Sequence, residues 1–287
     1  MSGVVAAIYS SFFLALSQAS LKKSYRELAP SVAFFFDATF GLILWIPLAI
    51  FFGIKLALFK EVLLYAILSA ILSEALVFYS LSKGQLSITT ILIGSYPIYT
   101  ILFSYLVNNE VLTPPLTAFV GITIFGTLIS YLPSKLNRKE LRKSGAILWP
   151  VVAAVAIGLS DTLSKRVINK TMDFTFLFAL ALVQVPVALV YLNLEKQNIL
   201  KELSEIKTKT YDYKNAIAGS LFNIIGTGLL WIAFSKTLAS IASPITATSG
   251  VLVIIISLLF LDEKISWRQF LGILFAFVGI IGIAVNV

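Results

Sequence analysis

The sequence predicts an all-α integral membrane protein with ten transmembrane helices, arranged as two inverted five-helix repeats. Three observations support this fold class: an apolar composition, ten long apolar segments, and a match between the two halves. Of the 287 residues, 59% are hydrophobic and only 13% are charged, whereas an ordinary soluble domain has about 25% charged residues. The mean hydropathy of +0.95 also indicates that a lipid bilayer is the chain's solvent.

The composition also limits the chemistry that the chain can perform. It contains neither cysteine nor histidine, which removes thiolates, the commonest metal ligand and the usual proton shuttle. We therefore expect no cofactor and no metal. The net charge of +8 does not indicate nucleic acid, because the basic residues lie between apolar segments. No cleavable signal peptide is expected, since an apolar segment follows Met1–Gly3 at once.

Ten segments come close to the roughly 20 mostly apolar residues that a membrane-spanning helix needs. They are residues 4–21, 31–53, 62–81, 87–107, 115–132, 146–168, 174–194, 215–236, 240–261 and 267–286. Most linkers are short, so successive helices are expected to be antiparallel neighbours. In the longer linker 195–214, apolar residues recur at helical spacing, which fits a short helix on the membrane surface or a solvated loop.

The two halves of the chain match each other. At an offset of 153, residues 75–130 align without gaps with residues 228–283, and Glu110 falls on Glu263. Five helices is an odd number, so the second copy must be inverted across the membrane. Inverted repeats are typical of alternating-access transporters, whose binding site lies near the midplane between the halves.

The repeat also predicts the domain organisation. We expect a first five-helix repeat at residues 1–133, a basic linker at 134–145 and a second five-helix repeat at 146–287. Upstream of the ungapped match, an offset of 143 aligns Lys22 with Lys165. The change in offset is absorbed by the long linker in the second half.

Three short motifs add a resemblance to a known family. Asn109-Glu110-Val111-Leu112-Thr113 and Asp262-Glu263-Lys264-Ile265-Ser266 follow the fourth and ninth segments, and Ser235-Lys236-Thr237-Leu238-Ala239-Ser240-Ile241-Ala242-Ser243-Pro244 joins the eighth to the ninth. With five helices duplicated, the chain resembles the EamA-like type of the drug/metabolite transporter superfamily. A Gly-Glu-like pair is common at the first two places, and Asn and Asp replace that glycine here. The resemblance implies a carrier of small metabolites, including amino acids, nucleotide sugars and toxic amphiphiles.

The distribution of positive charge predicts the orientation. The odd-numbered loops hold 16 of the Lys and Arg residues and the even-numbered loops hold 6. Since cytoplasmic loops are enriched in positive charge, both termini are expected outside the cell membrane. Members of the resembled family are often drawn with cytoplasmic termini, so the two interpretations conflict, and we follow the charge count.

Glu74 is the strongest candidate for a functional group. It lies near the middle of the third segment, where an ionisable side chain is costly and is by default a functional hypothesis. It could bind a proton or a cationic substrate, or it could be a structural hydrogen-bonding group. Asp37 lies in the second segment and could form a proton-sharing pair with Glu74.

A polar face on the eighth segment is the second candidate. Asn223, Thr227 and Trp231 recur at every fourth position, and the repeat aligns Thr227 with Glu74 and Trp231 with Phe78. These residues are predicted to face one central cavity, although intramembrane Asn often joins helices by hydrogen bonds. Tyr79 and Gln184 are further candidate cavity donors.

Two helix breaks are predicted at corresponding places. Tyr96-Pro97 interrupts the fourth segment and Ser249-Gly250 matches it in the ninth. Proline removes a helical hydrogen bond and glycine loosens the helix. Paired breaks indicate a binding site or hinge, so Tyr96 is a candidate binding residue and Pro97 and Gly250 are candidate hinges.

Gln18 and Asp161 occupy matching places near the ends of the first and sixth segments, where a gate is one possible role. Lys165 follows Asp161 by one helical turn, so a local ion pair that anchors the helix end is the simpler expectation.

The leading functional hypothesis is a secondary active transporter, an exporter or exchanger of a small organic metabolite, with protons as candidate coupling ions at Glu74. No ATP-binding motif is present. The alternative is a lipid-handling or structural membrane protein without coupled transport. An intramembrane enzyme that uses Asp37 and Asp161 is disfavoured, because no catalytic motif surrounds either residue. The bilayer and a small-molecule substrate are the expected partners, and both a monomer and a homodimer remain open.

Overall fold

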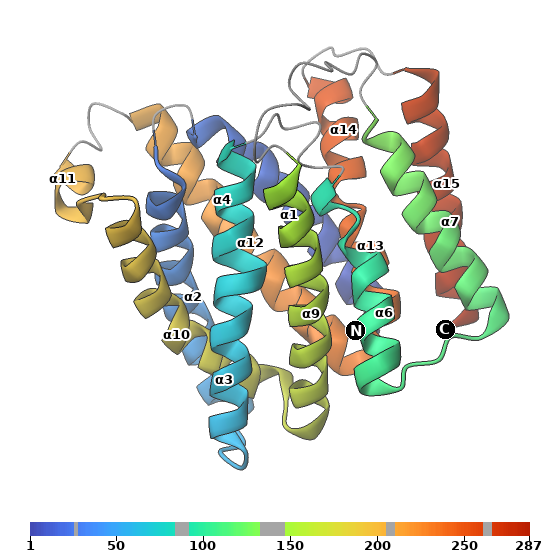
Figure 1. The fold of residues 1–287 in the computed structure, drawn as a ribbon, viewed down its shortest axis with the longest axis horizontal. Coiled ribbons are helices and arrows are strands. Elements are labelled where there is room, and N and C mark those ends of the chain that lie inside the picture. The colour runs from blue at the N-terminus through green and yellow to red at the C-terminus, as the bar shows by residue number, and fades with distance from the viewer. Residues whose placement is uncertain (26–27, 84–91, 133–146, 205–209, 261–265) are drawn as a thin grey trace.

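The computed structural model describes residues 1–25, 28–83, 92–132, 147–204, 210–260 and 266–287, and every regular element among them is a helix (Figure 1). The first half contains α1 (Gly3–Ser24), α2 (Pro30–Phe52), α3 (Phe59–Ser69), the π-helix η1 (Ala70–Ala75), α4 (Leu76–Lys83), α6 (Tyr96–Asn108) and α7 (Pro114–Ser130). The second half contains α9 (Leu148–Lys170), α10 (Asp173–Leu194), α11 (Ile199–Ser204), α12 (Thr210–Lys236), α13 (Ala239–Ala247), α14 (Ser249–Phe260) and α15 (Trp267–Asn286). The prediction of an all-α membrane protein is confirmed.

The helices follow the ten predicted apolar segments. The third segment forms α3, η1 and α4 in continuous succession, and the ninth forms α13 and α14. Among the described residues, seven helical segments are long and apolar enough to cross a membrane. Helix α7 is shorter, with 17 residues. The start of the predicted fourth segment, the linker 134–145 and Glu263 lie outside the described residues.

The helix pairs follow the same pattern in the two halves. Helices α2 and α10, which are equivalent in the two repeats, pack against each other, and so do α7 and α15. Helix α1 packs against α12 and against α13 and α14, just as its equivalent α9 packs against α3, η1 and α4 and against α6. Exchanging the halves leaves this pattern unchanged, as an inverted repeat requires.

Both chain termini lie at one end of the helix bundle (Figure 1). The same end carries the junction of α9 with α10 and the junction of α12 with α13, and we call it the terminal end. Helix α11 and the start of α12 lie at the opposite end. The short helix α11 shows that the charged linker 195–214 contains a helical turn where the apolar spacing predicted one.

Both predicted helix breaks are present. Helix α6 begins only at Tyr96, after a turn at Gly94 and Ser95. In the second half, α13 ends and α14 begins around Thr248. The two breaks therefore occupy corresponding places in the repeats, next to the cavity described below.

Candidate functional site

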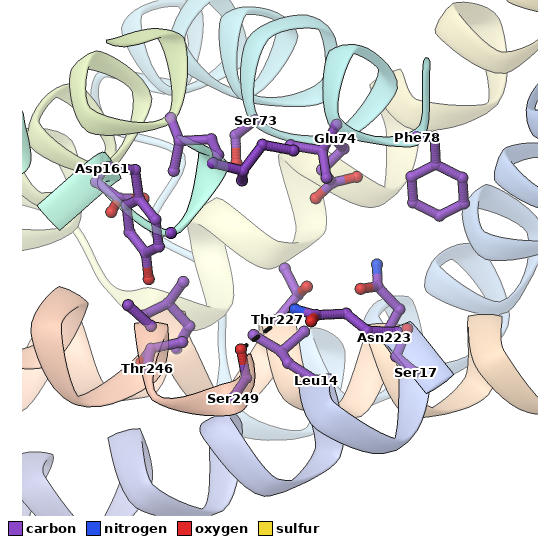
Figure 2. Close-up of a pocket in the computed structure, with 18 of the residues that line it drawn as sticks. Leu14, Ser17, Ser73, Glu74, Phe78, Asp161, Asn223, Thr227, Thr246 and Ser249 are labelled. Atoms are coloured by element: carbon purple, nitrogen blue, oxygen red, sulfur yellow. Dashed lines mark hydrogen bonds between the residues drawn. The ribbon is translucent and has the colours of Figure 1, made fainter. Parts of the chain in front are cut away.

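A cavity of about 140 Å³ lies between the two halves of the molecule (Figure 2). The first half contributes side chains from α1, η1, α4 and the ends of α6 and α7. The second half contributes side chains from α9, α12, α13 and α14. Each repeat therefore forms one wall of the cavity, as the inverted-repeat architecture predicts.

Eight of the thirteen predicted site residues line this cavity, namely Gln18, Glu74, Phe78, Tyr96, Asp161, Asn223, Thr227 and Trp231. Asp37 and Gln184 lie directly behind the wall, where they bind Asn223 and Glu74. The other three, Tyr79, Pro97 and Gly250, are placed elsewhere. Position is what the structure establishes here, and the roles of these residues in binding, coupling or gating stay predictions.

Glu74 lies in the π-helix η1, in the middle of the third span. Single-turn π-helices occur frequently at functional sites. The side chain is 5% exposed, and the amide of Gln184 on α10 donates to its Oε2 atom. Its Oε1 atom has no hydrogen-bond partner among the described residues. One oxygen is thus held in place, while the other is buried without a described partner.

Asp37 forms a second layer behind Glu74. It is fully buried, its Oδ1 atom accepts a 3.0 Å hydrogen bond from the amide of Asn223, and Glu74 is a neighbouring carboxyl group. The sequence raised a pairing of these two carboxyl groups, and the structure brings them close together. Gly41, one turn further along α2, leaves room for Gln184, since a Cβ atom there would lie 2.6 Å from Gln184 Oε1.

Asp161 lines the cavity from α9 and is fully buried. Its Oδ2 atom accepts hydrogen bonds from Thr100 at 3.2 Å and Ser243 at 2.7 Å, and its Oδ1 atom has no described partner. The predicted ion pair of Asp161 with Lys165 is wrong. Lys165 turns away and donates instead to the carbonyl groups of Phe234 and Thr237, which have no partner within their own helix.

The helix break between α13 and α14 is held by side chains from the first half. Gln18 donates to Ser249 Oγ at 3.2 Å, as the dashed line in Figure 2 shows. Tyr131 donates to the carbonyl of Ala247 at 2.6 Å, and its ring fills the space where a side chain at Gly250 would lie. Tyr96 donates to the carbonyl of Ser243 at 3.0 Å. Two tyrosine hydroxyl groups from the first half therefore bind carbonyl groups of α13 on the approach to the break.

Two of the remaining predicted residues pack away from the cavity. Tyr79 makes an edge-to-face contact with Trp149, with ring centroids 5.4 Å apart. Pro97 is buried in the first turn of α6, where its missing N–H costs little. Sequence reasoning missed Ser17, Ser73 and Tyr131, which also line the cavity. Serine is common in apolar helices, so no local pattern distinguished Ser17 and Ser73 from other serines.

Comparison with known proteins agrees with this architecture. The model of the EamA-like transporter family matches residues 1–132 and 144–285. An uncharacterized protein of Methanocaldococcus jannaschii, MJ1333.1, is 29% identical over 141 residues, which is 49% of this chain and 97% of that protein. Purine permease 21 of Arabidopsis thaliana is 22% identical over 217 residues, which is 68% of this chain and 56% of the permease.

The fold of one solved crystal structure matches the fold of this chain with a TM-score of 0.76 at 13% sequence identity. The match covers 99% of this chain and 96% of the other chain. That likeness concerns the fold alone. The family match extends over nearly the whole chain in two segments and agrees with the apolar helices and the central cavity. The chain belongs to the EamA-like transporter family and is a multi-pass membrane protein.

Proposed function

We propose that the protein is a secondary active transporter that exports or exchanges a small organic metabolite by alternating access. The observation that carries this proposal is the cavity between two symmetric halves, lined by buried polar atoms without described partners. Its size is below the ~300–1,000 Å³ of typical drug-sized ligand sites, which favours a small substrate. The paired helix breaks beside the cavity provide places where the halves can change their relative positions.

Glu74 is the coupling group in this proposal. A carboxyl group that faces the cavity can take up a proton from one side of the membrane and release it to the other side when the cavity changes sides. The amide of Gln184 holds Glu74 in place without a positive charge to neutralise it. We place the protein in the cell membrane, with the terminal end outside, on the basis of its charge distribution.

An intramembrane enzyme has less support. Its proposed pair, Asp37 and Asp161, would have to act on one reacting group. Asp37 is instead bound to Asn223 and lies beside Glu74, whereas Asp161 is bound by Thr100 and Ser243. Each carboxyl group thus belongs to a separate set of partners.

Transport by the purified protein in lipid vesicles tests the proposal. Wild-type protein and Glu74→Gln are compared with a panel of amino acids, polyamines, nucleotide sugars, sugar phosphates, lipophilic cations and adenine. We expect the wild type to accumulate at least one compound under an imposed pH gradient. Glu74→Gln should lose this accumulation, because no side chain remains at this place to carry the proton.

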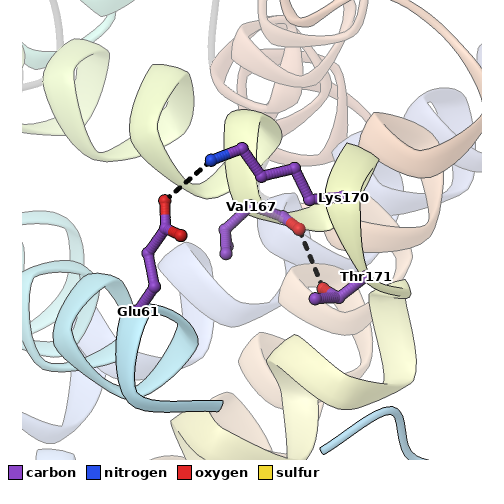
Figure 3. A network of polar contacts seen from close by, with 4 residues as sticks. All are labelled: Glu61, Val167, Lys170 and Thr171. Atoms are coloured by element: carbon purple, nitrogen blue, oxygen red, sulfur yellow. Dashed lines mark hydrogen bonds and ion pairs between the residues drawn. The ribbon is translucent and has the colours of Figure 1, made fainter. Parts of the chain in front are cut away.

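A matched control comes from Glu61, which forms an ion pair of 3.0 Å with Lys170 at the terminal end (Figure 3). Both side chains are partly exposed to solvent, and Glu61→Gln should transport like the wild type. Normal accumulation by Glu74→Gln would show that coupling does not pass through Glu74. If no compound is moved by any variant, the transporter proposal fails and a structural or lipid-handling role takes its place.

A further inference from the structure

The unsatisfied polar atoms of the cavity indicate what it binds. Five lining residues keep a buried side-chain atom with no described hydrogen-bond partner: Ser17, Glu74, Asp161, Trp231 and Thr246. Nearly all buried polar groups in proteins are hydrogen-bonded, and leaving one unpaired is costly. Five such atoms around one space are therefore expected to meet a ligand or water there.

The charges around the cavity have one sign. Glu74 and Asp161 are lining residues, with Asp37 behind them, and no described lining residue is Lys or Arg. Lys165, one turn from Asp161, is already bound to two carbonyl groups. A carboxylate buried without a positive partner is strongly unfavourable. The compensating positive charge, either a proton or a bound cation, must therefore come from outside the protein.

Glu74 and Asp161 have the same pattern of hydrogen bonds. Neutral donors hold one oxygen of each: an amide from Gln184 binds Glu74, and hydroxyl groups from Thr100 and Ser243 bind Asp161. The second oxygen of each group is the one without a described partner. Hydrogen bonds between a carboxylate and a charged donor are about twice as strong as neutral ones, so these free oxygens favour a charged donor.

Aromatic side chains supply the remaining surface. Trp231 and Phe78, which the repeat aligns with each other, both line the cavity and are 1% and 3% exposed. Figure 2 shows Phe78 beside Glu74. Aromatic faces attract organic cations within about 6 Å of the ring centre, and they also pack against an apolar body.

We propose that the substrate is a small organic cation, with its ammonium group at Glu74 and Asp161 and its apolar body against Phe78 and Trp231. This proposal rests on the transport function proposed above and names the substrate class of the same site.

Three probes of similar size and different charge test the substrate class: benzylamine, benzyl alcohol and benzoate. Binding to the purified protein is measured by the rise in melting temperature with ligand concentration, because a ligand of the folded state stabilises it. We expect benzylamine to stabilise the protein. Benzyl alcohol and benzoate should bind with an affinity that is lower by about tenfold or more, because neither can form the hydrogen bond between charged groups. Glu74→Gln and Asp161→Asn should each reduce the benzylamine response, whereas Glu61→Gln should not.

The outcomes separate this proposal from the transport function. Equal or stronger binding of benzyl alcohol, benzoate or adenine, together with transport of a neutral or anionic compound in vesicles, would overturn the cation proposal and leave the transporter intact. Absence of binding by every amine from methylamine to benzylamine would also overturn it. Absence of binding and transport for every class would overturn both proposals.

A different observation concerns the junction of α12 with α13 at the terminal end. Lys165 donates to the carbonyls of Phe234 and Thr237, the second at 2.9 Å. Glu110 accepts hydrogen bonds from the backbone N–H groups of Ala239 at 3.1 Å and Ser240 at 2.9 Å. It also accepts from Ser240 Oγ at 2.7 Å. Both charged side chains are less than one-tenth exposed.

These contacts match charge to helix polarity. A helix carries partial negative charge at its C-terminus and partial positive charge at its N-terminus. Lys165 satisfies the last carbonyls of α12, and Glu110 satisfies the first N–H groups of α13, whose orphan donors have no partner within the helix. The two side chains also attract each other electrostatically. We call these two residues with the junction the α12–α13 clamp.

The clamp joins helices that surround the cavity. Lys165 belongs to α9 and Glu110 follows α6, so the junction is bound to two neighbouring helices at once. Between the cavity and the clamp, Thr162 of α9 contacts Ser104 Oγ at 3.2 Å, and its carbonyl accepts a 2.9 Å hydrogen bond from Asn108. Gly3 of α1 packs against Thr237, where a larger residue would overlap it. Buried polar contacts thus join these helices at the terminal end, and separation of the helices would break them.

The geometry points to the α12–α13 clamp as the gate that keeps the cavity closed at the terminal end. Because the chain has no cysteine, Thr246→Cys places a single thiol at the cavity wall. Its labelling rate by a membrane-impermeant maleimide measures access from each side of the membrane. In vesicles of either orientation, Val287→Cys identifies the face that carries the termini.

Removal of either charge should open the terminal end. In the Thr246→Cys background, Glu110→Gln and Lys165→Met are each expected to raise labelling from the terminal face by about tenfold, since a charged hydrogen bond shifts an equilibrium by that factor or more. Ser240→Ala, which removes a single contact, should give a smaller rise in the same direction. Glu61→Gln removes an exposed carboxylate at the same end and should leave the rate unchanged.

Unchanged labelling in the Glu110, Lys165 and Ser240 variants would overturn the gate. An equal rise in labelling from both faces would also overturn it, because that result indicates general loosening rather than a gate at one end. Melting temperatures of the same preparations identify variants that fail to fold. Ser240→Ala, which keeps both charges, then decides the question.

Discussion

At the scale of single residues, amide side chains are the donors that position two of the buried carboxyl groups. Gln184 binds Glu74, and Asn223 binds Asp37. An amide satisfies an oxygen lone pair without cancelling a negative charge. A lysine or arginine in either place would form a permanent ion pair and leave nothing for a proton or a cation to bind. The residue types thus keep the charge of the cluster available for exchange.

The bond between Asn223 and Asp37 should contribute measurably to stability. Asn223→Ala leaves a buried carboxylate oxygen without its donor, and we expect a loss of about 1 kcal/mol in the free energy of unfolding, within the range for polar contacts between membrane helices. Denaturation in detergent measures the difference. Asn215→Ala removes a solvent-exposed hydrogen bond in the same helix and should change stability much less. Equal effects of the two substitutions would contradict this role of Asn223.

At the scale of helices, α7 and α15 pack backbone against backbone. A Cβ atom at Gly126 would overlap the backbone of α15 at Ala276, and one at Gly272 would overlap the backbone of α7 at Ser130. Small residues at helix interfaces allow such close approach within membranes. The repeat aligns Gly126 with Gly279, which in turn faces the backbone of α7 at Thr123. The contact is therefore built symmetrically from equivalent positions of the two halves.

Two alanine substitutions on α7 should have opposite consequences. Gly126→Ala forces the two backbones apart, and we expect it to cost about 1–3 kcal/mol in the free energy of unfolding, as overpacking typically does. At Gly121 nothing lies within 4 Å of an added Cβ atom, so Gly121→Ala should be neutral or stabilise the helix by up to about 1 kcal/mol. Thermal unfolding of the two variants measures both effects. A loss of stability at Gly121 alone would contradict the packing described for α7 and α15.

At the scale of the whole molecule, the apolar segments and the repeat predicted the fold and much of the cavity. Hydropathy reports where lipid surrounds a helix, so it located the spans. The alignment of Thr227 with Glu74 placed two helices at equal depth, and both residues line the cavity. This reasoning succeeds because symmetry relates residues that are distant in the sequence.

Partners chosen by packing were not predictable in this way. Spacing along α9 predicted that Lys165 would bind Asp161, but its ammonium group instead donates to the carbonyl groups of Phe234 and Thr237 at the end of α12. Tyr131 and the π-helical turn at Glu74 also depend on how neighbouring helices meet. A single sequence contains the residues of such contacts but not the distances between them.

The orientation of the whole molecule follows from charge, and it can be measured with the same cysteine-free background. The odd-numbered loops hold most of the Lys and Arg residues, so the face of the membrane that carries these loops should be the cytoplasmic one and the termini should lie on the other face. Val287 and Ser204 are exposed and lie near the two ends of the bundle (Figure 1). In intact cells, Val287→Cys should react with a membrane-impermeant maleimide, and Ser204→Cys should react only after the cells are permeabilised. The reverse pattern would show that the termini are cytoplasmic and that the α12–α13 clamp faces the cell interior.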